Sequence, residues 1–302
     1  MAKRTCFGAV ALAGLVAAMA GNLPAVAAGE PPRLPGELLG YAFYTQAGQA
    51  DLQDPETPGQ AGTVTLHELT ACLPLPVYQR DGWQGLAGPL LEWHRFDFSG
   101  LDGLEDLDLY SVALLLGAVY NGLEHWEFTA SAMPGFYTDF RQTDRDDFKT
   151  MFHGQAAWWV SESLQLVLGA AYDSALGDDE LYPVGGLRWD PLPQWSFRLM
   201  FPEPMVVWMP AARLALYLHA LPAGGKWNMR DSAPEYKEYD FKTESLRVGG
   251  GCELKLRGPF WLHLSGGMDF DRKYKIEGQG DDYLLRSDVD DTWYVRAGMA
   301  VR

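Results

Sequence analysis

The chain has 302 residues, a formal net charge of −16 at pH 7 and 47% hydrophobic residues. The acidic balance argues against nucleic acid as a partner, because neutralising phosphates requires a basic patch. Beyond residue 28 no apolar run approaches the roughly 18 residues of a membrane-spanning helix. Outside the N-terminal segment only Cys72 and Cys252 occur, and both lie on the apolar side of alternating runs, which suits small hydrophobic residues better than a disulfide framework.

The N-terminus combines a basic start, Met1-Ala2-Lys3-Arg4, with a short apolar run and the sequence Pro24-Ala25-Val26-Ala27-Ala28. This arrangement is typical of a cleaved secretory signal. We therefore expect a signal peptide over residues 1–27. No linker divides the remainder, so residues 28–302 are expected to form a single domain.

Most of the remaining chain alternates between apolar and polar residues. A period of two indicates extended strands, because successive side chains point to opposite faces. No segment of useful length has the period of a helix. The alternation predicts about thirteen strands, over 38–50, 64–78, 85–98, 110–120, 126–136, 148–160, 164–172, 182–189, 195–208, 214–220, 245–257, 260–270 and 292–302.

The clearest of these runs form a pair near the C-terminus, over 245–257 and 260–270. Leucines and other apolar residues occupy one parity, whereas arginine, glutamate, lysine and histidine occupy the other. The dipeptide Gly258-Pro259 separates the two runs, which predicts an antiparallel hairpin. The glycines Gly249-Gly250-Gly251 indicate a strand kink or room for a large neighbouring side chain.

Alternation suits a soluble β-sandwich as well as a membrane barrel. Four observations favour the barrel: an apolar parity almost free of charge, unusually long strands, a last strand at the chain end, and aromatic residues at the ends of apolar stripes. The aromatic pairs lie ten residues apart, for example Tyr110 and Tyr120. Ten tilted residues span about 25 Å, the height of an outer-membrane apolar band. We predict an all-β, antiparallel, up-and-down transmembrane β-barrel of about twelve strands, with ten or fourteen as alternatives.

The sequence also resembles a known family. The secretion signal, the segment Leu199-Met200-Phe201-Pro202-Glu203-Pro204 and the glycine-rich hairpin are similar to an uncharacterised family of Gram-negative outer-membrane β-barrel proteins, which carries a domain of unknown function. The resemblance covers most of the chain after the signal. It implies a barrel fold and an outer-membrane location, with no activity or site residues to transfer.

The last strand resembles the signal that the barrel-insertion machinery reads. Arg296, Gly298 and Val301 fall where a polar residue, a glycine and a hydrophobic residue are expected, although the chain stops one position before the usual aromatic. The expected partners are therefore outer-membrane lipids, the insertion machinery and small solutes.

Charged residues on the polar parity are the candidates for lining the lumen: Arg198, Arg213, Arg247, Glu253, Lys255, Arg257, His263, Asp269 and Arg296. Such residues tune which solutes enter a pore, and the leading hypothesis is a passive channel. The alternatives are a closed structural or surface-interaction barrel, in which the same residues form an internal salt-bridge plug, and a soluble periplasmic sandwich.

A hydrolase is a weaker hypothesis. His263, Ser265 and Asp269 share a face, but residues two apart on one strand are neighbours in any case. No cofactor is predicted, since no Lys-Ser pair follows the three glycines as a phosphate loop would require. No metal site is predicted either, because the six histidines show no ligand spacing.

Overall fold

The computed structural model describes residues 39–53, 61–101, 105–230, 238–278 and 283–302. The expected signal peptide, residues 1–27, lies outside the described residues. The described chain contains seventeen strand segments in one sheet. They are β1 (Gly40–Gln53), β2 (Ala61–Cys72), β3 (Leu75–Arg80), β4 (Trp83–Ser99), β5 (Leu107–Leu123), β6 (Trp126–Thr138), β7 (Phe148–Ser161), β8 (Leu164–Asp173), β9 (Glu180–Leu192), β10 (Trp195–Phe201), β11 (Met205–Ala211), β12 (Leu214–Pro222), β13 (Gly225–Arg230), β14 (Glu238–Lys255), β15 (Phe260–Gly278), β16 (Tyr283–Val289) and β17 (Thr292–Val301).

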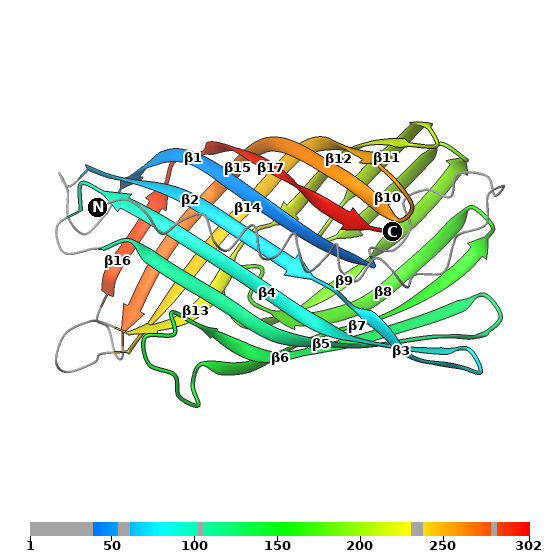
Figure 1. Ribbon diagram of the computed structural model, residues 1–302, viewed down its shortest axis with the longest axis horizontal. Coiled ribbons are helices and arrows are strands. Elements are labelled where there is room, and N and C mark those ends of the chain that lie inside the picture. Colours follow the sequence, from blue (N-terminus) through cyan, green and yellow to red (C-terminus); the bar gives the residue numbers. More distant parts are fainter. Residues whose placement is uncertain (1–38, 54–60, 102–104, 231–237, 279–282) are drawn as a thin grey trace. The chain divides into compact units, whose positions relative to one another are not determined.

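Three pairs of segments continue one another along a shared neighbour: β2 with β3, β12 with β13, and β16 with β17. The seventeen segments of the described chain therefore make fourteen barrel strands. The first strand pairs with the last, from Gly40 with Val301 to Ala47 with Tyr294, which closes the sheet (Figure 1). A closed antiparallel sheet has no exposed edge.

The barrel prediction is confirmed, and the soluble sandwich is excluded because the sheet closes on itself. The strand count is fourteen, the upper end of the expected range. The additional strand comes from residues 195–208, which the alternation predicts as one strand. The structure divides them into β10 and β11 at Pro202-Glu203-Pro204.

The two ends of the barrel differ in their connections. At one end, which we call the turn end, strands are joined by short turns such as 81–82, 124–125, 162–163 and 212–213. At the other, the loop end, the connections include 100–106, 139–147 and 174–179. The exception is the connection 202–204, which joins two strands of only seven residues each. The barrel wall is therefore low at the β10–β11 hairpin.

A belt of outward-facing apolar side chains surrounds the barrel over its middle and its turn end. Leu168 and Leu218 belong to this belt, and they are 73% and 67% exposed. Aromatic rings stack on one another at the turn end of this belt, in pairs such as Trp126–Trp158 and Trp195–Trp208. An apolar band bordered by an aromatic girdle is the surface that a barrel presents to lipid.

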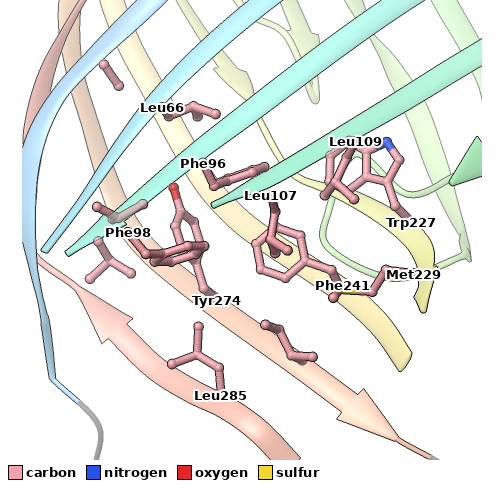
Figure 2. Close-up of a cluster of buried hydrophobic side chains, with 14 of the residues drawn as sticks. Leu66, Phe96, Phe98, Leu107, Leu109, Trp227, Met229, Phe241, Tyr274 and Leu285 are labelled. Carbon is pink, nitrogen blue, oxygen red and sulfur yellow. The ribbon is translucent and has the colours of Figure 1, made fainter. Parts of the chain in front are cut away.

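The polarity reverses at the loop end, in a region that we call the cap. Its interior is an apolar core, in which Phe96 and Phe241 lie among other buried side chains (Figure 2). Phe96, Phe241 and Ile276 are at most 1% exposed. Its exterior carries charged residues, for example Arg95, which bonds Asp97, and Lys242, which bonds Glu277. The cap core comprises Ala50, Leu52, Val64, Leu66, Phe96, Phe98, Leu107, Leu109, Trp227, Met229, Tyr239, Phe241, Tyr274, Ile276, Leu285 and Val289.

A row of one-residue irregularities marks the boundary between belt and cap. Relative to β14, strand β15 carries one extra residue around Asp271, whose φ is 48°. Relative to β2, strand β1 carries one between Ala47 and Ala50. The β16–β17 strand, which lies between β15 and β1, pairs with both of them in an unshifted register across the boundary. The extra residue changes which parity faces inward, so that Asp269 and Arg272 are both buried inside the barrel.

Candidate functional site

A cavity of about 440 Å³ lies inside the barrel. Phe96, Trp227 and Tyr274 of the cap core line it, as do Arg198 and Arg302. Its volume falls within the roughly 300–1,000 Å³ that is usual for small-molecule sites. The lining combines charged side chains with aromatic and aliphatic ones, so the cavity is amphipathic.

An ion triad of Glu68, Arg247 and Asp269 forms part of the cavity wall. The Arg247 Nε and one terminal nitrogen donate to the two oxygens of Asp269 at 2.8 and 2.9 Å, and the other donates to Glu68 Oε2 at 2.9 Å. The guanidinium also lies over the Tyr294 ring, 4.8 Å from its centroid. All three charged groups are buried, and Arg247 is 1% exposed. One cation held by two carboxylates has its donors satisfied, which makes this triad a fixed structural group.

Glycines on β14 and β15 create the space for the tyrosines beside the triad. A methyl group on Gly249 or Gly267 would collide with the ring of Tyr294, and one on Gly251 would meet the Tyr217 hydroxyl. Of the two sequence interpretations of this glycine run, the structure supports room for large neighbours. The phenol rings of Tyr217 and Tyr294, from the strands that flank this hairpin on its two sides, therefore lie against its glycines.

A second polar cluster lies around His263. The Tyr217 hydroxyl hydrogen-bonds the His263 Nε2 at 2.9 Å, and Ser265 Oγ lies 3.3 Å from the same nitrogen. Glu253 Oε1 lies 3.3 Å from His263 Nδ1 and accepts a hydrogen bond from Arg302 at 2.8 Å. The grouping resembles a serine–histidine–carboxylate site only in part, because Tyr217 is the closer partner of the nitrogen that would activate the serine.

The hydrolase hypothesis placed Asp269 as the third member of that site. In the structure both oxygens of Asp269 bind Arg247, so it does not orient His263. Glu253 occupies that position instead. The geometry gives the hydrolase no further support.

Arg296 lines the cavity from β17. Its Nε donates to Thr45 Oγ1 at 2.8 Å, and its guanidinium lies 5.9 Å from the centre of the Phe43 ring. Next to it, the hydroxyl of Tyr294 hydrogen-bonds His219 Nε2 at 2.9 Å. In contrast to Arg247, Arg296 forms no ion pair with a carboxylate among the described residues.

Six of the nine residues proposed for the lumen line this cavity: Arg198, Arg247, Glu253, His263, Asp269 and Arg296. Lys255 lies at the last position of β14, with its ammonium 5.7 Å from the centre of the Trp261 ring. Arg213 and Arg257 lie outside the lumen, because the chain is already turning at these positions and both side chains are exposed. The alternation continues into both turns, which is why parity alone assigned them to the interior.

The sequence interpretation missed Glu68, His94, Tyr217 and Tyr294, which also belong to the cavity wall or the triad. One signal pointed to Glu68. It is the only charge on a parity that otherwise reads Val64, Leu66, Thr70 and Cys72. A lone carboxylate on an otherwise uncharged strand face requires a partner. That partner, Arg247, lies 179 residues away, so the sequence could not identify it.

Within the described residues, no three metal-ligating side chains form a group that could hold a metal ion. No helix in the described part of the chain is long and apolar enough to cross a membrane.

Several solved structures have a similar fold. The chain is similar to an outer-membrane channel from Pseudomonas putida F1, with 12% identity, a TM-score of 0.42, and coverage of 91% of this chain and 99% of that one. It is also similar to a mutant of the TodX monoaromatic hydrocarbon channel, with 9% identity, a TM-score of 0.40 and coverage of 90% and 93%. The translocator domain of the autotransporter NalP from Neisseria meningitidis matches with 11% identity, a TM-score of 0.36 and coverage of 97% and 94%. Likenesses this distant assign no function.

No curated protein matches the chain by sequence. Residues 116–301 match the family described as a domain of unknown function, DUF6268, and this match covers more than half of the chain. The resemblance to an uncharacterised barrel family is thereby confirmed. The chain is a member of the DUF6268 family, in which residues 116–301 form a large part of a closed transmembrane β-barrel.

Proposed function

We propose that this protein is an outer-membrane channel for small solutes whose route passes through the central cavity. The apolar belt with its aromatic girdle supports a location in lipid, and the expected signal peptide supports export to the outer membrane. Short turns usually face the periplasm and longer loops the outside. In this orientation the turn end is periplasmic and the cap projects from the cell surface.

The position of the cavity relative to the cap supports this proposal most directly. The dry cap core fills the barrel interior at the loop end, so a straight path along the axis is closed there. The cavity instead reaches the low rim of the wall, where Glu203, Met205, Leu221 and Gly224 line it. A solute would therefore leave sideways, above the β10–β11 hairpin and beside the cap.

The β8–β9 loop, residues 174–179, bonds to the strands beside this proposed exit and would act as its cover. The backbone N–H of Gly224 donates to the Ala175 carbonyl at 3.0 Å. Asp178 accepts hydrogen bonds from Lys226 at 3.0 Å and from Lys242 at 2.8 Å. Asp179 accepts one from Lys149 at 3.0 Å. Because these bonds are few and partly exposed to solvent, opening the loop requires much less free energy than opening the cap.

Single-channel conductance of the purified protein in a planar bilayer tests the proposal. The double variant Asp178→Asn/Asp179→Asn should loosen the loop and raise the fraction of time in the open state. The matched control is Asp106→Asn/Asp108→Asn, which removes bonds to Arg95 on the outer surface of the cap and should leave conductance unchanged. A folded barrel that never conducts, as wild type or as the loop variant, would contradict the channel.

A closed structural barrel is the second candidate, and the Arg247 triad favours it. An ion cluster with all of its members satisfied can brace two sides of a barrel without any transport. The same recordings separate the two candidates, since heat-modifiable, correctly inserted protein with no conductance in either form is the result that a structural barrel predicts.

A further inference from the structure

Two of the arginines that line the cavity, Arg247 and Arg296, have very different surroundings. Arg247 is held by two carboxylates on three of its nitrogens. Arg296 makes one hydrogen bond, to the uncharged hydroxyl of Thr45, and none of its terminal nitrogens bonds a described residue. Arg296 is half-buried and lines the cavity.

An arginine inside a barrel cannot avoid the cost of its charge by losing a proton, because it stays protonated in proteins. Its charge is best compensated by an anion whose geometry matches the planar guanidinium, and a carboxylate does so with two parallel hydrogen bonds. We propose that the cavity binds a small amphipathic monocarboxylate, whose carboxylate group pairs with Arg296. This inference rests on the proposed function and names the class of solute for it.

The apolar part of the ligand follows from Phe43 and from other apolar side chains of the same cavity. The Phe43 ring lies beside the guanidinium, and Met205, Val207 and Leu221 line the same cavity. These side chains offer contact to an aromatic ring or a short alkyl chain and no hydrogen bonds to a sugar or a peptide. The cavity of about 440 Å³ suits a ligand of this size.

The remaining charges of the cavity favour one carboxylate over two. Glu92 and Glu203 also line the wall, and Glu68 and Asp269 share the single positive charge of Arg247, so the triad remains net negative. No second arginine among the described cavity residues lacks a partner in the way that Arg296 does. A second negative charge on the ligand would meet carboxylates, so dicarboxylates should bind poorly.

Isothermal titration of the detergent-solubilised barrel with benzoate and with benzamide tests the inference, because the two probes have nearly the same shape and differ in charge. Wild type should bind benzoate about tenfold or more tightly than benzamide, the preference expected from a charged hydrogen-bonded pair. The variant Arg296→Gln should lose this preference, and Arg296→Lys should regain part of it. The control Arg213→Gln, in an exposed turn, should behave like wild type.

Equal binding of benzoate and benzamide by wild type, or an unchanged preference in a folded Arg296→Gln barrel, would overturn the inference. Succinate binding as tightly as benzoate would also overturn it, since it contradicts the assignment to monocarboxylates. The titration does not depend on conduction. A conducting barrel without benzoate selectivity therefore removes this inference alone, whereas selective binding in a barrel that never conducts removes only the channel.

Discussion

The belt section and the cap are formed by the same long strands, yet they bury opposite kinds of side chain. In β14, Glu253 faces inward and Leu254 faces outward within the belt, whereas Phe241 faces inward and Lys242 outward within the cap. The belt faces lipid and encloses polar and charged side chains, while the cap faces water and encloses apolar ones. The medium outside each section, rather than the strand itself, therefore determines which face must be apolar.

The largest expected effect is in the belt section, where charges are buried inside. Arg247→Met leaves Glu68 and Asp269 buried without their cation, and breaking a buried ion pair typically costs about 3–5 kcal/mol. We expect this loss in the free energy of unfolding, measured by urea titration in detergent. Arg296→Met is the matched control, because that arginine has no carboxylate partner, and it should cost far less. Equal losses for both variants would mean that the triad does not stabilise the barrel.

Removing an aromatic ring from the cap core tests how far that apolar core stabilises the cap. Phe241 is fully buried against Phe96 and Tyr274, with ring centroids 4.7 and 5.8 Å away. Phe241→Ala should cost about 3–5 kcal/mol of cap stability. Hydrogen exchange should show faster exchange in the cap strands, with the belt section still protected. Phe270→Ala, at an outward position, is the control, and uniform loss of protection along the whole barrel would contradict an independent cap.

A charge placed on the lipid-facing surface should have a smaller but clear effect. Leu218→Arg introduces a cation at an outward position of β12 within the belt, which costs roughly 2–4 kcal/mol near the middle of a bilayer. The control Asp288→Arg adds a cation to the outer surface of the cap and should be tolerated. The measurement is the fraction of protein that reaches the heat-modifiable form in membranes. If both variants assemble equally well, the belt does not face lipid.

The smallest effect concerns pH and the loop between β8 and β9. Burial opposes ionisation of Asp178, but the hydrogen bonds from Lys242 and Lys226 outweigh it and lower the pKa of this carboxyl below its ordinary value. The loop contacts are therefore fully present above the ordinary aspartate pKa and are lost as the pH falls through the lowered one. Open probability in bilayer recordings should rise on strong acidification in wild type. In Asp178→Asn it should be raised already at neutral pH, and an unchanged response in that variant would show that another group controls the loop.

Much of the belt section was predictable from the sequence, because alternation reports directly on a wall with lipid on one side and water on the other. The hairpin of β14 and β15, the outward leucines and the closing role of the last strand all follow from that rule. The glycine run also indicated room for large neighbours, which Tyr294 and Tyr217 occupy.

The cap was not predictable in the same way, because its apolar parity looks the same in sequence and faces the opposite direction. Phe96 and Phe98 alternate just as Leu114 and Leu116 do, yet the first pair lies in a core and the second faces outward. The triad was also not predictable from the sequence, since it joins strands that are distant in the chain. The connection at residues 202–204 was not predicted, because three residues hardly interrupt the alternation between β10 and β11.

The extra residues at the boundary of the cap make chain length itself a constraint on this protein. Three adjacent strands, β1, β16–β17 and β15, share one shift relative to the strands on either side. A deletion of Asp271 alone would remove the irregularity between β15 and β14 but would shift the cap part of β15 by one residue relative to β16. A matching deletion in all three would restore the hydrogen bonds and would keep Tyr274 and Ile276 inside the cap, because Asp269 and Arg272, which now have two residues between them, would then follow the ordinary alternation. Family members should therefore tolerate substitutions at this boundary far more readily than insertions or deletions. Where a deletion does occur in one of the three strands, the other two should carry a matching deletion.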